Sequence, residues 1–415
     1  MPAPRKPAPP RKSPPKTAPV APKPKFNLRT FGGALGAILL LRVILGLWAL
    51  PISARFPETM LEKRIAIWPP SAPLEVWSQR VIVKPWVRYD ALHYASIVQR
   101  GYNLRVGQSA FHPLFPLLGW PLVRLGLPPS GALLLISTLA SVLLCLTFAR
   151  YVAKFHGDAA QGAPALLFGG LCGFLLLAPY NESLFLVLAL GSIWAMRDNR
   201  LWLAGALGGL AALTRQQGLA LVLPLMWQIG ATRRWRDAFS VALIFAGYGA
   251  FVIYRLRVLH DFDPARAHGA LELVRGLLVS PASQNMVGGQ HLAWPWQTVA
   301  AQWQRLTTTP NPYHLATDLF LGGAMVFLAL CGWKNLHPTE RLFALTIALL
   351  SLCYFNGLDQ PLLSFPRHMM LAFPLYITLA RWASKTPARG RLTLEIAFAL
   401  NLFLAAAYFR NGWVP

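Results

Sequence analysis

The segment GALLLISTLASVLLCLTFA, residues 131–149, decides the fold class of this chain. It contains no charged side chain. As an α-helix, a segment of this length extends about 28 Å, close to the roughly 30 Å hydrocarbon core of a bilayer. It therefore predicts a membrane-spanning helix, and much of the remaining sequence repeats the pattern.

Apolar segments recur along most of the 415 residues. The chain is 55% apolar and only 13% charged, whereas about a quarter of a soluble globular chain is charged. We expect an all-α polytopic membrane protein with about eleven transmembrane helices. The expected spans are 31–51, 131–149, 163–179, 183–196, 201–214, 218–230, 238–256, 315–333, 341–355, 367–382 and 392–409.

The first 29 residues have a different composition, with eight Lys/Arg, ten prolines and no acidic residue. The prolines prevent a regular helix, so we expect a disordered cytoplasmic tail that touches anionic membrane lipid. The net charge of +24 suggests nucleic-acid binding. The placement of the cations beside membrane spans argues against it, and we expect no nucleic-acid partner.

Two long polar connections, at about 52–130 and 257–314, interrupt a single transmembrane domain of residues 30–410. The apolar segment 110–127 is broken by prolines, and whether it spans decides the side of every later loop. If it is interfacial or re-entrant, thirteen Lys/Arg of the later short loops lie in the cytoplasm, in agreement with the positive-inside rule. We therefore expect a cytoplasmic N-terminus, both long loops outside, and a helix at 91–100 lying on the membrane surface.

Four polar clusters then emerge on the outer side. They are RYDALHYASIVQRGY (88–102), PYNES (179–183), TRQQG (214–218) and FPRH (365–368). A charged side chain at membrane depth must face a partner or a wet cavity. We therefore expect the four clusters to converge on one site.

The charged residues of these clusters each allow two interpretations. Asp90 precedes the 91–100 helix, so it is either the N-cap or a working carboxylate. Glu182 either forms a structural ion pair with Arg215 or contacts a substrate. Arg215 and Arg367 suit bidentate phosphate binding better than lysines do, although Arg367 is also placed to extend to the membrane edge.

Other polar residues carry weaker signals. His112 is either a proton shuttle or an interfacial structural histidine. Trp294 and Trp296, with Trp86, are candidates for a sugar-stacking platform. Asp261-Phe-Asp263 matches the D-x-D metal motif, but three letters recur by chance, so we expect no metal and no cofactor. The cysteines Cys145, Cys172, Cys331 and Cys353 lie in apolar runs and are expected to be buried free thiols.

Three blocks of the sequence resemble the PIG-V-like mannosyltransferases, the family of GPI mannosyltransferase 2 and its bacterial relatives. The blocks are RYDALHYASIVQRGY with AFHPLFPLL, YNESLFLVLALGSIW with LAGALGGLAALTRQQGL, and FPRHMMLAFPLYI. They occur in the family's order and cover about residues 30–385. Tyr89, His112 and Asn181 depart from the family's usual Trp, Phe and Ser.

The resemblance implies a GT-C helical bundle with its active site on the extracytoplasmic face. It implies transfer of mannose, or another hexose or pentose, from a polyprenyl or dolichyl phosphate to a glycolipid or glycan hydroxyl. The membrane is the plasma membrane in a bacterium and the endoplasmic reticulum in a eukaryote. The expected site comprises Asp90 as general base; Arg215, Arg367 and Arg88 at the donor phosphate; and Trp86, Tyr89, His93, Tyr94, His112, Tyr180, Asn181, Glu182, Gln216 and His368 at the substrates.

Two functions from other classes remain open on the sequence. A transporter or lipid-linked sugar flippase would use the same outer cavity, although transporters often carry paired repeats and none is evident here. A non-catalytic assembly subunit would use Asp90 only as a helix cap.

Overall fold

The structure is a computed structural model that describes residues 28–53, 83–279 and 290–410. Except for its last two residues, the predicted tail of residues 1–29 lies outside the described residues, as does much of the first long connection. The helices are α1 (Leu28–Ser53), α4 (Asp90–Arg100), α5 (Leu114–Arg124), α6 (Pro129–Phe155), α7 (Ala163–Gly169), α8 (Glu182–Arg197), α9 (Leu201–Thr214), α10 (Val222–Thr232), α11 (Ser240–Tyr254), α12 (Ala270–Leu278), α14 (Pro295–Thr308), α15 (Tyr313–Cys331), α16 (Pro338–Cys353), α17 (Phe365–Met370), α18 (Pro374–Ala383) and α19 (Pro387–Phe409).

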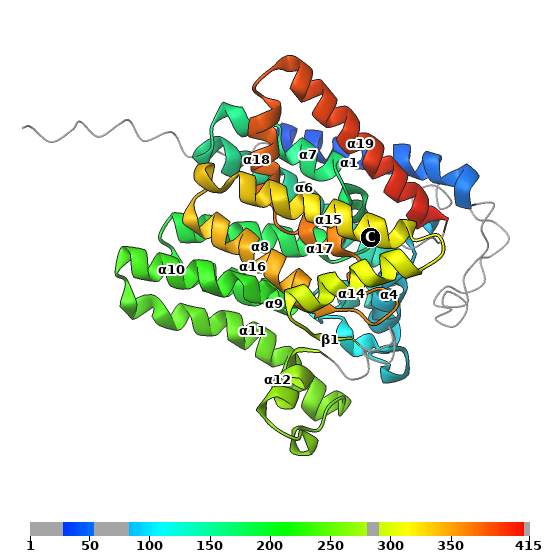
Figure 1. Cartoon of the computed structure of the whole chain (residues 1–415), viewed down its shortest axis with the longest axis vertical. Coiled ribbons are helices and arrows are strands. Elements are labelled where there is room, and N and C mark those ends of the chain that lie inside the picture. Colours follow the sequence, from blue (N-terminus) through cyan, green and yellow to red (C-terminus); the bar gives the residue numbers. More distant parts are fainter. Residues whose placement is uncertain (1–27, 54–82, 280–289, 411–415) are drawn as a thin grey trace, which may run out of the picture.

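The protein is an all-α membrane protein. Among the described residues, five helical stretches are long and apolar enough to cross a membrane: Thr30–Ile52, Pro129–Phe155, Trp235–Leu259, Tyr313–Cys331 and Pro387–Phe409. The expected count of eleven spans stays a prediction. The only described strands, β1 (His291–Leu292) and β2 (Tyr354–Phe355), form a short antiparallel pair. Figure 1 shows α8, α9, α10, α11 and α16 running side by side, with α12 projecting from the edge of the bundle.

Two predicted spans are interrupted in the structure. The segment 163–179 forms α7, which ends at Gly169, and then a 3₁₀ turn, Gly173–Leu177. A Cβ on Gly170 would lie 2.2 Å from the Leu166 carbonyl oxygen, so the close turn of the backbone requires glycine. The segment 367–382 is likewise divided into α17 and α18, with Pro374 as the first residue of α18.

The helix predicted at 91–100 is present as α4, and its position at the membrane surface stays a prediction. Every side chain from Ala91 to Val98 is buried, because α5 and α6 cover the helix. Helix α5 has eleven residues and rises only about 16 Å, about half the hydrocarbon thickness. By itself it is too short to span, and the interfacial or re-entrant placement of the 110–127 segment stays a prediction.

Glycines bring α9 and α11 into close contact. A Cβ on Gly209 would lie 2.4 Å from the Leu243 carbonyl oxygen, and a Cβ on Gly247 would lie 2.0 Å from the Gly209 carbonyl oxygen. Such small residues let two helix backbones approach closely inside a membrane, where van der Waals packing drives association. This contact fixes α9, whose last turn leads into the polar TRQQG segment.

We expect Gly247→Ala to destabilise the protein by at least about 2 kcal/mol, because the new methyl group has no room against the backbone of α9. Gly249→Ala on the same helix is the matched control, since a Cβ there would meet no atom within 4 Å. Thermal unfolding in detergent measures the difference. Equal melting temperatures for the two variants would contradict the described α9–α11 packing.

Candidate active site

Asp90 is the first residue of α4, and its side chain is 26% exposed. The preceding residue, Tyr89, has a φ of 46°, a conformation that costs a non-glycine residue about 1–3 kcal/mol and is typical of functional sites. The Tyr89 ring packs against Tyr408, with 5.6 Å between the centroids. The structure assigns no side-chain cap to α4, so the helix-cap interpretation of Asp90 is wrong. Its carboxylate instead accepts a hydrogen bond from Arg367.

Four charged side chains form one continuous network, which we call the charged quartet: Asp90, Glu182, Arg215 and Arg367. Arg367 donates from Nη2 to Asp90 Oδ2 over 2.6 Å and from Nε to Glu182 Oε1 over 2.7 Å. Arg215 donates from Nη1 to the same Glu182 oxygen over 2.5 Å. One member comes from each of the four polar clusters that the sequence predicted to converge.

The packing of α8 beside α9 brings Glu182 and Arg215 together. Glu182 begins α8 and Arg215 directly follows α9, so the short turn between the two helices puts both residues at the same end. Asn181 links the start of α8 to the end of α9. Its side-chain amide donates to the Thr214 carbonyl over 2.7 Å, and its side-chain oxygen accepts from Arg215 Nη1 over 2.8 Å. The Glu182–Arg215 ion pair that the sequence allowed is therefore present.

Arg367 reaches the quartet from α17. Its guanidinium lies over the Tyr180 ring, 4.8 Å from the centroid, in a cation–π arrangement. The Tyr180 hydroxyl donates to the Arg88 carbonyl over 3.0 Å. Tyr180 thus supports Arg367 and ties it to the segment that leads into α4.

The quartet has a formal net charge of zero. Glu182 is fully buried, whereas the side chains of Arg215 and Arg367 are 10% and 11% exposed. A lone charge at this depth would be costly, so each charge depends on its partners. Asp90 is the most exposed member of the network.

Comparison with protein-family models and with curated proteins finds no match.

Two of the predicted substrate residues, His93 and Tyr94, lie on α4 and pack within the protein. The His93 ring stacks on Phe111 at 4.8 Å, and the Tyr94 ring meets Phe111 and Phe115 edge-on, at 5.1 Å each. These aromatic contacts hold the helix that carries Asp90.

Trp86 does not form the expected sugar platform with Trp294 and Trp296. It is completely buried, its ring meets Phe409 edge-on at 5.4 Å, and its carbonyl accepts a hydrogen bond from Tyr408. Trp294 and Trp296 are exposed and stack on each other at 5.1 Å. Trp86 therefore presents no ring face to a sugar in this structure.

The remaining predicted residues neighbour the quartet in sequence. The Arg88 side chain is buried. Gln216 begins the 3₁₀ turn after Arg215 and is partly exposed. His368 follows Arg367 in α17, and its ring centroid lies 6.5 Å from that of Tyr354.

His112 is a packed histidine between α9 and α11. Its Nδ1 is 2.8 Å from the Ala212 carbonyl oxygen, and its ring contacts Phe251 at 4.8 Å. Burial lowers the pKa of His112 to about 3, more than the hydrogen bond to Ala212 raises it. The histidine is therefore neutral at physiological pH, with Nδ1–H donating to the carbonyl.

The two aspartates of the D-x-D motif have separate partners. Asp261 accepts from Arg255 Nε over 2.9 Å and from the Ser109 hydroxyl over 3.1 Å. Asp263 accepts from the Ala265 backbone N–H over 3.0 Å. Within the described residues, no group of three or more His, Cys, Asp or Glu side chains is arranged to hold a metal. The four cysteines are thiols rather than disulfides, but only Cys172 is fully buried and Cys331 is exposed.

Sequence reasoning missed a second buried network at the other end of α8. Glu340, on α16, accepts hydrogen bonds from Tyr151 and from Arg197, the latter over 2.9 Å, and its Oε1 lies 2.8 Å from His156 Nε2. The available signal was the HPTE sequence at 337–340, where His337 and Glu340 form a capping box. This network joins α6, α8 and α16.

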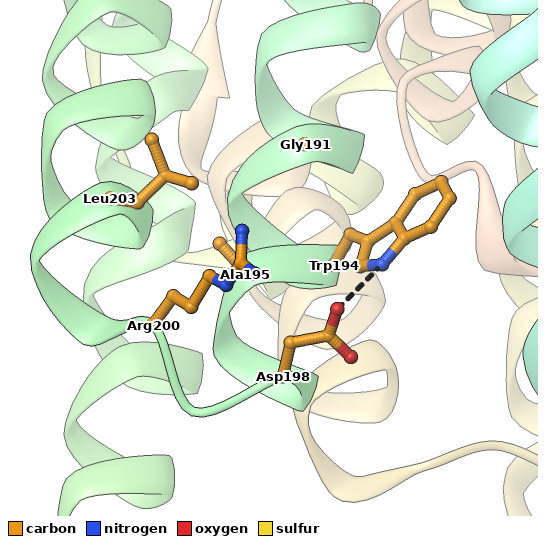
Figure 2. Close-up of a pocket in the computed structure, with 6 residues that line it drawn as sticks. All are labelled: Gly191, Trp194, Ala195, Asp198, Arg200 and Leu203. Atoms are coloured by element: carbon orange, nitrogen blue, oxygen red, sulfur yellow. Dashed lines mark hydrogen bonds between the residues drawn. The ribbon is translucent and has the colours of Figure 1, made fainter. Parts of the chain in front are cut away.

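A cavity of about 220 Å³ lies near the same end of α8, lined by Gly191, Trp194, Ala195, Asp198, Arg200 and Leu203. Figure 2 shows the Trp194 indole pointing to Asp198, to which it donates over 3.0 Å. Lys154 also binds this carboxylate, over 2.6 Å and 2.8 Å. Because its only carboxylate already has two partners, this cavity is a weaker candidate for acid–base chemistry than the quartet.

We expect His112 to make the protein less stable in mild acid. Its pKa is about 3 in the folded protein and about 6.5 when exposed, so the stability it contributes is present above pH 6.5 and lost as the pH falls below it. At pH 5 the loss is ~2 kcal/mol. Melting temperatures of wild type and His112→Gln between pH 7 and pH 5 should show a shallower decline for the variant.

The same substitution at the exposed His260 is the control. It should leave the wild-type decline unchanged. An identical pH dependence for wild type and His112→Gln would contradict the burial of a neutral His112.

Proposed function

We propose that the protein is an integral-membrane glycosyltransferase that moves a sugar, mannose in the first instance, from a polyprenyl-phosphate carrier to an acceptor hydroxyl. The observation that carries the proposal is the charged quartet. It combines a partly exposed carboxylate with two neighbouring arginines whose side chains are only 10% and 11% exposed, within a membrane domain. This is the pairing that such a transfer requires: a base for the acceptor and cations for a phosphate leaving group.

The reaction is a single displacement. The acceptor oxygen attacks the anomeric carbon, and its proton passes to the Asp90 carboxylate. The bond between that carbon and the phosphate oxygen breaks, and its electron pair remains on the phosphate. Attack opposite to the leaving group inverts the configuration at the anomeric carbon.

The leaving group gains charge during the reaction. The donor phosphodiester carries one negative charge, and the released lipid phosphate carries between one and two at neutral pH. Arg215 and Arg367 are suited to stabilise this increase, because a guanidinium binds phosphate oxygens through two parallel N–H groups. In this mechanism the residues of the chain supply the acid–base chemistry and the leaving-group stabilisation.

The resemblance to PIG-V-like mannosyltransferases supports the same assignment, since its blocks contribute Asp90, Glu182, Arg215 and Arg367. On this basis we assign a GT-C-type bundle to the chain, with the quartet opening on the extracytoplasmic face and both long connections on that side. The acceptor is then a glycolipid or glycan, and the donor a polyprenyl- or dolichyl-phosphate sugar.

A transporter or flippase for a lipid-linked sugar is the second candidate. The interrupted helices α7 and α17/α18 favour it, because broken helices beside polar residues commonly form transport sites. Movement of lipid-linked sugar across sealed vesicles without a new glycosidic product would favour this candidate over transfer.

Asp90→Asn should lower transfer from labelled polyprenyl-phosphate-mannose by about 10²–10⁴-fold, because the amide cannot accept the acceptor's proton. Membranes that contain equal amounts of inserted protein provide the assay. Asp359→Asn is the control, because Asp359 is a 91% exposed carboxylate paired with Arg305. Undiminished transfer by Asp90→Asn would end the assignment of Asp90 as base.

Arg215→Lys should lower kcat/KM for the donor by at least about tenfold, because a lysine keeps the charge but loses the forked geometry. Arg305→Lys in the Arg305–Asp359 pair serves as the matched control. A donor titration with each variant measures the effect. If Arg215→Lys and Arg305→Lys behave alike, Arg215 does not bind the donor phosphate.

A further inference from the structure

Glu182 binds its two arginines in an unusual way. Its Oε1 accepts from both Arg215 and Arg367, whereas its Oε2 is buried and has no hydrogen-bond partner among the described residues. A carboxylate that only neutralises one arginine commonly uses both oxygens toward it. In the quartet, one oxygen instead keeps two guanidiniums next to each other.

The charges of the quartet are compatible with replacement of Asp90 by a phosphate. Glu182, Arg215 and Arg367 together carry a net charge of +1, and Asp90 brings the sum to zero. A sugar phosphodiester carries the same single negative charge as the Asp90 carboxylate. It can also accept the hydrogen bond that Arg367 Nη2 now donates to Asp90. A phosphate that takes the place of Asp90 therefore leaves the net charge of the network unchanged.

The difference in burial between Glu182 and Asp90 indicates which of the two carboxylates a phosphate would displace from Arg367. Glu182 is fully buried, contacts both arginines, and is fixed at the start of α8, whereas Asp90 is 26% exposed and binds Arg367 through one hydrogen bond. Removing the buried carboxylate from its partners would leave charges uncompensated at depth. Asp90 can instead be solvated or meet an acceptor hydroxyl.

We infer that Glu182 is a positioning residue that holds Arg367 and Arg215 in place while the phosphate of a lipid-linked donor replaces Asp90 on Arg367. The inference rests on the proposed function and adds to it the order in which the donor and the acceptor engage the site. Asp90 is bound to Arg367 until the donor arrives and becomes available to the acceptor only afterwards. The donor therefore binds before the acceptor is activated.

The exchange is tested by binding of farnesyl phosphate, a short isoprenyl phosphate, to the full chain in detergent, with farnesol as the phosphate-free control. Asp90→Asn should tighten farnesyl phosphate binding about fivefold, because it removes the competitor for Arg367. Arg367→Gln should weaken binding. In the Asp90→Asn, Arg367→Gln double variant the gain should disappear.

The double variant separates exchange from simple repulsion. If Asp90 only repelled the phosphate through space, its removal would tighten binding at least as much when Arg367 is absent. That result overturns the inference, as does a wild-type protein that binds farnesyl phosphate no better than farnesol.

Glu182→Gln tests the positioning role, with Glu340→Gln as the matched control, because Glu340 is an equally buried acid bound to an arginine on α8. Glu182→Gln should weaken farnesyl phosphate binding about tenfold and abolish the gain from Asp90→Asn, whereas Glu340→Gln should change neither. Tighter binding in Glu182→Gln would mean that Glu182 competes with phosphate, and unchanged binding would mean that Glu182 does not position the arginines. Either result would overturn the positioning role. If Glu182→Gln does not fold, Glu182→Asp, which keeps the charge but shortens the side chain, takes its place with the same expectations.

The binding measurements test the exchange and the transfer assay tests the proposed function, so either can be rejected without the other. Sugar transfer without coupling between Asp90 and Arg367 rejects the exchange and leaves the proposed function standing. Coupled phosphate binding without any sugar transfer rejects the transferase and leaves the exchange standing.

Discussion

The candidate site depends on one buried oxygen, Glu182 Oε1, which lies within hydrogen-bond distance of both Arg215 and Arg367. An ionised carboxylate at this depth is stable only with cationic partners, and two guanidiniums so close together need an anion between them. Glu182 supplies the anion that the two arginines need, and the arginines supply the cations that Glu182 needs. The arrangement leaves Arg367 a hydrogen bond for Asp90, the most exposed member of the network.

The helices support this arrangement from both ends of α8. At its start, Glu182 and Asn181 bind α8 to the end of α9, and at its last turn Arg197 reaches the buried Glu340 of α16. Close glycine contacts hold α9 against α11. The site thus lies at the ends of closely packed helices, while Asp90 follows the strained Tyr89 at the beginning of α4, the element that the exchange of partners would involve most directly.

Much of this was predictable from local sequence patterns. The apolar segment 201–214 coincides with α9, and 183–196 differs from α8 by one residue at each end, because unbroken apolar runs bounded by charges mark helices well. Hydropathy did not reveal the interruptions at Gly170 and before Pro374, which depend on backbone geometry rather than on polarity. The burial of α4 was missed as well, because its polar residues are covered by the packing of α5 and α6, which the local hydropathy of α4 does not specify. The partner of Asp90 lies 277 residues away, and no local pattern specifies that contact.

The most direct test of the account is a cryo-EM structure of the full chain with a non-transferable polyprenyl-phosphate sugar. The account predicts the lipid phosphate within hydrogen-bond distance of Arg215 and Arg367, with Glu182 still between the arginines and Asp90 turned from Arg367 toward the space beside the anomeric carbon. A phosphate bound at the opposite end of α8, beside Arg200 and Asp198, with the quartet unchanged, would contradict it.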